Sequence, residues 1–375
     1  MMTTSTIALP VETGTDDELW RLQAELDGLF AISQVTYPTH RDQPIRYVGR
    51  LLLPADVAFA QLQQRLACHA YTPTLYREGG DDVLLAIPGL FQATRSRVWI
   101  NVVLFVLTVL TTLFAGAANE LGTVPTSLSE LAMGVPFALS LLAILGAHEF
   151  GHYFLARRHK VDVTLPYFIP VPIGVGTFGA FIKMKSPVTD RRALFDVAVA
   201  GPLAGLAVAI PLLFIGLHLS DVAAVRLGSG GIQEGNSLLY AAIKFLVFGR
   251  WLPSGGQDVL LHPIAFAAWF GLLITAFNLL PVGQLDGGHI IYALLGTSSR
   301  WIGYATLAVL VVLGFVAWNG WFMWAFLIVF VTGMQHPTPL NALTGLDARR
   351  KALGWLAMLI FFLTFTPAPL AMLMG

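Results

Sequence analysis

The chain contains a succession of long apolar runs from Val98 onward, and this feature constrains its fold more than any other. A helix needs about 20 mostly apolar residues to cross the hydrocarbon core of a bilayer. Runs that reach or approach this length lie at 98–118, 132–156, 194–218, 260–281, 301–318, 321–335 and 354–373. They predict a mainly α fold, a polytopic bundle of about seven transmembrane helices.

The composition agrees with a membrane protein. Charged residues make up 12% of the chain, about half of the roughly 25% that is usual for soluble domains. Hydrophobic residues make up 56%, and the mean hydropathy is +0.70. We therefore expect the lipid bilayer to be the chain's main partner. The formal net charge of zero gives no support for a nucleic-acid partner.

The first part of the chain is more polar, and we predict a small soluble α+β domain at 1–95 and a membrane domain at 96–375. Within the first domain the patterns predict a helix, a strand, a second helix and a hairpin that turns at Gly79-Gly80, at 16–30, 44–53, 54–70 and 71–89. Residues 1–30 are rich in acids and lack an apolar stretch, so we expect no targeting segment there. The single cysteine, Cys68, excludes an intramolecular disulfide and is expected to be buried.

Basic residues orient the bundle, because cytosolic loops carry an excess of Lys and Arg. The loop 119–130 has no basic residue, whereas three other regions do, through Arg95, Arg97, Arg157, Arg158, Lys160, Lys183, Lys185, Arg191, Arg192, Arg349, Arg350 and Lys351. These clusters share one side if the 1–95 domain is cytosolic. The apolar segment 237–249 is too short to span and carries Lys244, so we expect an interfacial or re-entrant helix.

Three ionisable residues interrupt the second apolar run, in the sequence HEFGH. A charged residue at the centre of a membrane helix costs roughly 2.5–3.5 kcal/mol on insertion scales, so such residues usually face a cavity or a functional site. His148 and His152 are four residues apart, share one helix face and can bind one zinc ion. Glu149 lies beside them as a candidate base.

A tetrahedral catalytic zinc usually has three protein ligands, so one more is needed. Asp286 follows a run that Asn278 and Pro281 would end, and Gly287-Gly288 after it allow close backbone approach. Irregular backbone at membrane depth is tolerated where it lines a cavity or is buried in protein. Asp286 is therefore the predicted third ligand, with His289 and His336 as rivals. Glu234 lies in a loop that we expect to be flexible and outside any span, and Asp196 is interpreted as a helix-start charge.

The two motifs HEFGH (148–152) and NLLPVGQLDGG (278–288) together resemble the site-2 protease family of intramembrane zinc metalloproteases. The resemblance covers roughly residues 132–296. It implies one Zn²⁺ per chain, held by His148, His152 and Asp286, with Glu149 activating the attacking water and Asn278 positioning the substrate or its oxyanion. The implied activity is hydrolysis of a peptide bond within or near the transmembrane segment of a single-span membrane protein, as in regulated intramembrane proteolysis.

Other segments favour one subgroup of that family. The loop 219–259 is too short for a PDZ module, and we expect no pair of CBS domains at the C-terminus. The N-terminal domain, GTFGAFIKMKSP (176–187) and GMQHPTPLN (333–341) resemble the cyanobacterial and chloroplast subgroup. The implied location is an integral protein of the bacterial inner membrane, with the 1–95 domain in the cytosol.

Two further segments suggest local structure, and two alternative functions compete with that of a protease. The stretch 173–187 follows a Pro-rich link and predicts a short hairpin, which either pairs with an unwound substrate or is a structural loop. Gly201 and Gly205 form a small-residue face that predicts close helix packing, and Pro202 predicts a kink. A transporter or ion-relay protein would also bury His, Glu and Asp. An inactive relative would be expected to lack Glu149 or a ligand, and none is missing.

Overall fold

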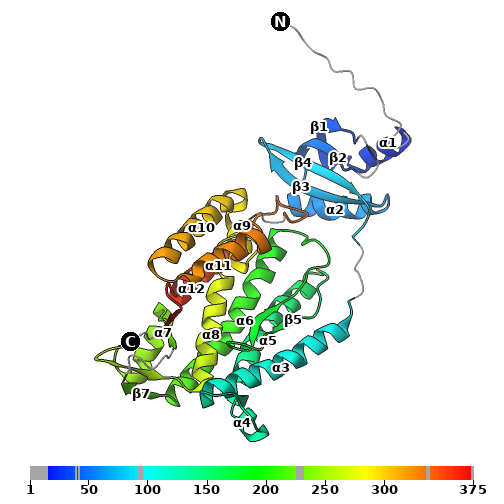
Figure 1. The fold of residues 1–375 in the computed structure, drawn as a ribbon. Coiled ribbons are helices and arrows are strands. Elements are labelled where there is room, and N and C mark those ends of the chain that lie inside the picture. The colour runs from blue at the N-terminus through cyan, green and yellow to red at the C-terminus, as the bar shows by residue number, and fades with distance from the viewer. Residues whose placement is uncertain are drawn as a thin grey trace. The chain divides into compact units, whose positions relative to one another are not determined.

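A computed structural model describes residues 16–38, 40, 43–91, 96–224, 232–334 and 338–372 of the chain. The chain forms two compact units (Figure 1). Unit 1 combines Met1–Ala93 with two later segments, Ser186–Arg191 and Thr338–Gly345. Unit 2 contains the remainder, Thr94–Lys185, Arg192–Pro337 and Leu346–Gly375.

Unit 1 is an α+β unit built on an antiparallel four-stranded sheet. Its elements are α1 (Asp16–Glu25), β1 (Phe30–Thr36), β2 (Ile45–Leu51), α2 (Ala55–Ala67), β3 (Tyr71–Glu78) and β4 (Asp81–Pro88). The strand order is β1-β2-β4-β3. Leu22, Leu62 and Leu84 bring α1, α2 and the sheet into one apolar core. The strand at 44–53, the helix at 54–70 and the hairpin at 71–89 are confirmed.

Two predictions in this unit are wrong. The helix expected over 16–30 ends at Glu25, and Phe30 begins β1 instead. Gly28 adopts a left-handed conformation with φ of 72°, which ends a helix readily because glycine has no Cβ. Phe30 fitted the helical spacing because it also faces the core, from a strand. Cys68, which was expected to be buried, is exposed.

The two later segments of unit 1 add to the edge of its sheet. β3 is an edge strand, and the Leu75 amide donates a hydrogen bond to the Leu340 carbonyl at 2.7 Å. The Leu75 carbonyl accepts one from the Ala342 amide at 2.8 Å, and the Leu340 amide donates to the Val188 carbonyl at 3.0 Å. Pairing in this way satisfies backbone groups that an edge strand would otherwise leave open. No periodicity in the sequence assigns these segments to unit 1.

Asn341 holds the second of these segments in place. Its side chain is buried and donates to the Ala55 carbonyl at 3.0 Å and to the Thr344 hydroxyl at 2.7 Å. Its amide oxygen accepts from the backbone N–H groups of Leu343 and Thr344 at 3.1 and 3.2 Å. One side chain therefore satisfies four polar groups.

We predict that Asn341→Ala destabilises unit 1. Each buried polar group left without a partner costs about 1–3 kcal/mol, so the sheet edge at Leu75 should open more often. Hydrogen exchange of the purified protein measures this as faster exchange of the Leu75 amide. Gln63→Ala on the exposed face of α2 is the control and should leave exchange unchanged. Unaltered protection of Leu75 in Asn341→Ala would contradict the prediction.

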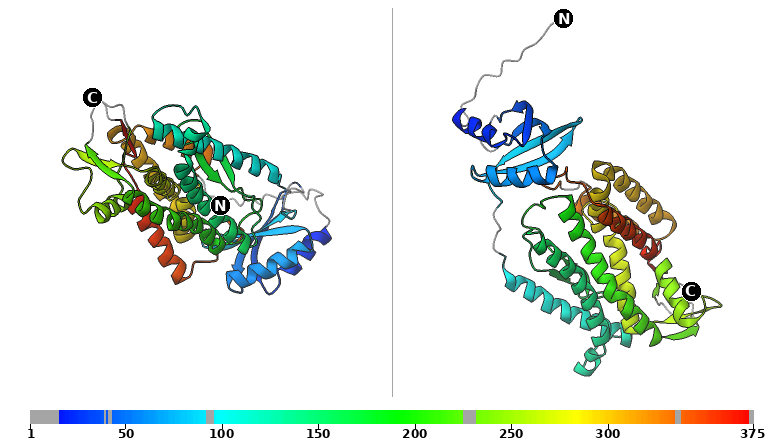
Figure 2. Two further views of the ribbon diagram at one scale, coloured as in Figure 1. Left: turned by 90° about the horizontal axis from the view of Figure 1, so that it is seen from below. Right: turned by 180° about the vertical axis from the view of Figure 1, so that it is seen from behind.

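Unit 2 is mainly helical, with short two-stranded sheets in its connections. Its elements are α3 (Val98–Leu121), α4 (Leu128–Ala132), α5 (Val135–Arg158), β5 (Tyr167–Pro170), β6 (Thr177–Phe181), α6 (Arg191–His218), β7 (Asp221–Ala224), β8 (Ile232–Glu234), α7 (Leu238–Phe248), β9 (Gln257–Leu260), α8 (Pro263–Asn278), α9 (Asp286–Leu295), α10 (Ser299–Val316), α11 (Gly320–Leu327), α12 (Ala348–Thr364) and β10 (Leu370–Met372), with short turns of 3₁₀ helix at Gly296–Ser298 and of π-helix at Ile328–Thr332. The helices pack as a bundle, and β5 lies against α3 (Figure 2).

Four apolar stretches among the described residues are long enough to cross a membrane. They are Val98–Leu121, Val135–Arg158, Arg191–His218 and Asp286–Val316. Three further apolar helices are shorter, Leu238–Phe248, Pro263–Asn278 and Gly320–Thr332. The spans predicted at 260–281 and 321–335 coincide with two of these shorter helices, and the span predicted at 354–373 overlaps α12. The protein is thus an integral membrane protein.

Lys244 on α7 is completely buried and lies beside two acidic residues, of which Asp258 is also buried. Its ammonium lies 3.3 Å from Asp258 Oδ1 and 3.9 Å from Glu234 Oε1. The Tyr240 hydroxyl donates to Glu234 at 3.0 Å, and burial raises the pKa of the Glu234 carboxyl. The prediction that Glu234 lies in a flexible loop is wrong. It ends β8, which pairs with β10, where its carboxylate can compensate the buried ammonium.

Candidate active site

Helix α5 carries the HEFGH motif with all three ionisable side chains buried. His148, Glu149 and His152 are 3%, 5% and 6% exposed. The two imidazole rings meet at 72° with their centroids 4.8 Å apart, as expected for residues one helical turn apart. Their Nε2 atoms are 3.1 Å apart. Both histidines therefore present the same ring nitrogen to one point.

Asp286 reaches that point because the chain folds back tightly after α8. A Cβ atom at Gly287 would lie 2.0 Å from the Leu279 carbonyl oxygen. One at Gly288 would lie 2.3 Å from the Gly283 carbonyl oxygen. Only glycine permits such approach of backbone to backbone. The prediction that Gly287-Gly288 serve close backbone approach is thus confirmed, and Asp286 begins α9 beside α5.

The carboxylate of Asp286 completes a triangle with the two histidines. Asp286 Oδ2 lies 3.3 Å from Nε2 of His148 and 3.3 Å from Nε2 of His152. Ligand atoms bound about 2.0–2.1 Å from a tetrahedral zinc lie about 3.3 Å from one another. Among the described residues this is the group of His, Cys, Asp and Glu side chains arranged to hold a metal ion. The separations of the three ligand atoms fit zinc, and so does a ligand set of two imidazoles and one carboxylate.

Helix α6 supports the histidines from behind. His152 Nδ1 lies 2.8 Å from the Val197 carbonyl oxygen, to which it donates when Nε2 is the free nitrogen. A Cβ at Gly201 would lie 2.1 Å from His152 Nε2, and one at Gly205 would lie 3.3 Å from the His148 Cβ. The small-residue face of α6 therefore packs on the imidazole rings of α5. The sequence predicted close packing here without indicating what is packed.

Glu149 lies beside the hairpin of β5 and β6. Its carboxylate accepts a hydrogen bond from the Ile182 backbone amide, directly after β6. The predicted hairpin at 173–187 is present, but it begins earlier, because the Pro-rich link itself forms β5 and pairs with β6. Phe178, the second residue of β6, is 78% exposed. The sequence patterns did not reveal Ile182 or Val197, because both act through backbone atoms.

The remaining candidates lie at different distances from the triangle. The Asn278 amide nitrogen is 3.2 Å from His148 Nε2, at the margin of the site. His289 is buried on α9, and its ring hydrogen-bonds the Gln284 backbone. It does not belong to the three-residue group. His336 lies outside the described residues.

Comparison with known proteins identifies the class. The sequence model of Peptidase family M50 matches residues 136–317, which contain both motifs. The chain belongs to this family, the site-2 protease family of zinc metalloproteases. The resemblance seen in the two motifs is confirmed, and the alternative of a transporter or ion-relay protein is not supported.

Three of the similar proteins are described as chloroplastic zinc metalloproteases of plants. The probable zinc metalloprotease EGY1 of Arabidopsis thaliana is 30% identical over 389 residues, covering 91% of this chain and 70% of that protein. EGY1 of Oryza sativa subsp. japonica is 29% identical, covering 86% and 62%. EGY2 of Arabidopsis thaliana is 34% identical, covering 65% and 44%. The chain thus spans less than three quarters of each relative's length. No solved structure matches the chain.

We predict that Gly201→Ala weakens zinc binding. The new methyl group would overlap the His152 ring, and displacing a ligand or its support typically costs about 10–100-fold in metal affinity. Chelator competition on the purified protein measures this affinity. Gly146→Ala is the matched control, because it lies on α5 with nothing within 4 Å of its new Cβ. Equal zinc affinity in Gly201→Ala and Gly146→Ala would contradict the contact.

Proposed function

We propose that this chain is an intramembrane zinc metalloendopeptidase that hydrolyses a peptide bond within or near the transmembrane segment of a single-span membrane protein. The observation that carries the proposal is the triangle of His148, His152 and Asp286, with Glu149 next to it on an apolar helix long enough to span a membrane. The chain's membership in Peptidase family M50 supports the proposal that its substrates are membrane proteins.

The roles of the residues follow from their chemistry. His148, His152 and Asp286 would hold zinc, which supplies a Lewis acid that polarises a peptide carbonyl and acidifies water. Glu149 accepts the proton of the attacking water and returns it to the leaving amine. The Asn278 amide, close to His148, donates to the oxyanion that develops on the carbonyl.

The substrate must be unwound before hydrolysis, because a helical peptide has its carbonyls engaged in its own hydrogen bonds. β5 and β6 form a two-stranded sheet, so β6 has a second edge that can accept an extended strand. The Ile182 amide at the end of β6 already bonds Glu149, so a strand added there would lie next to the base. We therefore favour substrate pairing over a purely structural role for this hairpin.

Helix α3 holds the hairpin from the other side. The Asn101 side-chain amide donates to the carbonyls of Leu165 and Pro166 at 2.8 and 3.0 Å. The Thr111 hydroxyl donates to the Gly176 carbonyl at 2.7 Å, near the turn. Anchoring at both ends supports a hairpin that keeps its geometry while a peptide binds to its edge.

The finer organisation remains part of the proposal. We propose seven spans, in which α8, the α11 segment and α12 cross the membrane despite being short, and a division into a 1–95 domain and a 96–375 domain. We propose that the chain resides in a bacterial inner membrane with the 1–95 domain in the cytosol, an orientation that the distribution of basic residues supports. EGY1 and EGY2 of Arabidopsis thaliana are described as chloroplastic, so in those two proteins the corresponding location is the chloroplast.

Glu149→Gln tests the catalytic role. Loss of a general base typically costs about 10²–10⁴ in rate, while the three ligands are untouched. We expect one zinc per wild-type chain, unchanged zinc in the variant, and loss of cleavage of a reconstituted single-span substrate. Zinc analysis and a gel-based cleavage assay provide both readouts. Undiminished cleavage by Glu149→Gln, or a wild type without zinc, would refute the proposal.

A second pair of variants tests the third ligand. Asp286→Ala removes one corner of the triangle and should lose zinc, whereas His289→Ala should retain it, because the His289 ring bonds the Gln284 backbone instead. Zinc content after gel filtration distinguishes the two. The reverse result would transfer the ligand role to His289.

A further inference from the structure

The proposed mechanism leaves unused a polar network close to α6 and the zinc ligands. Val197 supplies the carbonyl that bonds His152 Nδ1, and Asp196 is the residue immediately before it. The hydrogen bond on the second ring nitrogen fixes the tautomer and orientation of a metal-binding histidine. Whatever fixes the start of α6 therefore also fixes the support of His152.

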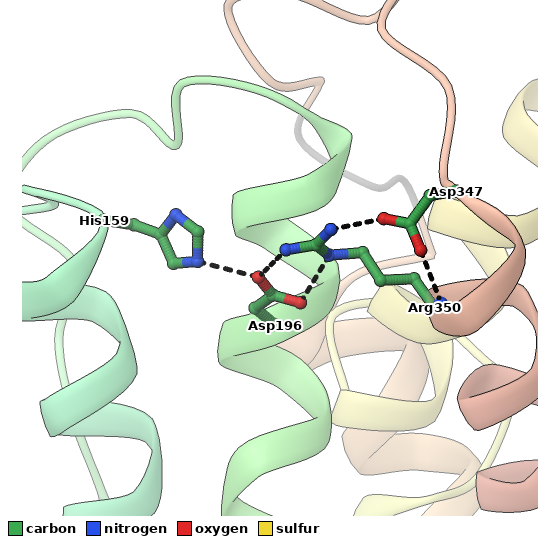
Figure 3. A network of polar contacts seen from close by, with 4 residues as sticks. All are labelled: His159, Asp196, Asp347 and Arg350. Carbon is green, nitrogen blue, oxygen red and sulfur yellow. Dashed lines mark hydrogen bonds and ion pairs between the residues drawn. The ribbon is translucent and has the colours of Figure 1, made fainter.

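Asp196 is bound from two neighbouring helices, as Figure 3 shows. Arg350 on α12 donates from Nε to Asp196 Oδ1 at 2.8 Å and from Nη2 to Oδ2 at 2.7 Å. His159, which follows the last residue of α5, places Nε2 2.8 Å from Asp196 Oδ2. The paired bonds from one guanidinium form the fork that gives an Arg–carboxylate contact both strength and a defined direction.

Arg350 is itself held in place. Asp347 caps the N-terminus of α12 and accepts a hydrogen bond from the Arg350 backbone amide at 3.0 Å, and its carboxylate also contacts the guanidinium. These bonds lower the pKa of the Asp347 carboxyl to about 2. The Asp196 side chain is 17% exposed and that of Arg350 31%. The network is thus partly shielded from water, where an ion pair acts more strongly than on an open surface.

The position of this network differs from that of an ordinary surface ion pair. It joins the C-terminal end of α5 to the N-terminal parts of α6 and α12 (Figure 3). α5 carries both predicted histidine ligands, and α6 carries the carbonyl and the glycine that support His152. Holding α5 and α6 together at this end therefore fixes the distance and direction of the hydrogen bond between the Val197 carbonyl and the His152 imidazole.

We propose that Asp196, held by Arg350 and His159, is a positioning residue for His152. It acts through Val197 by fixing the first turns of α6 against α5, and its own side-chain bonds are to Arg350 and His159. The sequence-based interpretation of Asp196 as a helix-start charge is wrong, because α6 begins at Arg191 and has no acidic residue in its first turn. The inference rests on the proposed zinc site and adds the element that sets the geometry of one ligand.

A purely structural network would behave differently from a positioning one. If the network only holds the three helices together, removing it lowers the melting temperature but leaves the zinc site of the folded protein unchanged. If it positions His152, its loss weakens zinc binding and lowers kcat, while KM for the substrate stays the same. Cobalt(II) substituted for zinc gives a visible spectrum that reports the ligand geometry directly.

Asp196→Asn and Arg350→Lys in the full-length protein test the proposal. The first keeps the size of the side chain and removes its charge, and the second keeps the charge but cannot form the fork. Loss of an outer-shell partner typically costs about 10–100-fold in metal affinity or activity. We expect an effect in this range for Asp196→Asn, a smaller one for Arg350→Lys, and an altered cobalt spectrum in both.

Arg157→Gln is the control. It removes a more open ion pair, with Asp162 at 3.5 Å, from the same end of α5, and should match the wild type in every readout. Folded Asp196→Asn with wild-type zinc affinity, kcat and cobalt spectrum would overturn the proposal while leaving the zinc site intact. If Asp196→Asn fails to fold, the same comparison with Arg350→Lys decides. A wild type that binds no zinc would overturn the zinc site itself.

Discussion

Two imidazoles and the Glu149 carboxylate lie buried where α5 meets α9, and the Asp286 carboxylate beside them is 16% exposed, in a unit whose helices are mostly apolar. Removing such groups from water is costly unless they bind a metal or one another. The glycine-rich turn before α9, the glycines of α6 and the Val197 carbonyl all serve to bring three of these groups within 3.1–3.3 Å. These separations match those between ligand atoms around a tetrahedral zinc ion.

Much of this could be predicted from the sequence. Long apolar runs specify membrane helices because backbone polar groups must be satisfied internally in lipid. The spacing of His148 and His152 places both on one face, and the glycines after Asp286 indicate a close approach of backbone. Alternating and helical patterns located β2, α2 and the β3–β4 hairpin of unit 1. Each of these features is indicated by residues that lie close together in the sequence.

The remaining features depend on contacts between distant segments. Nothing local indicates that residues near Asn341 complete a sheet formed by residues 30–88, or that Lys244 is buried against Glu234. The supports of the site from Val197 and Ile182 are backbone groups, which have no side-chain signature. Asp196 had a sufficient local explanation as a helix-start charge, and only the fold reveals its contact with Arg350.

X-ray absorption at the zinc edge of the purified wild-type protein tests the central claim most directly. The structure predicts a first shell of nitrogen and oxygen atoms at about 2.0–2.1 Å, with the outer-shell scattering of two imidazole rings. Scattering from only one imidazole, a sulfur atom in the first shell, or a protein that retains no zinc would contradict a site formed by His148, His152 and Asp286.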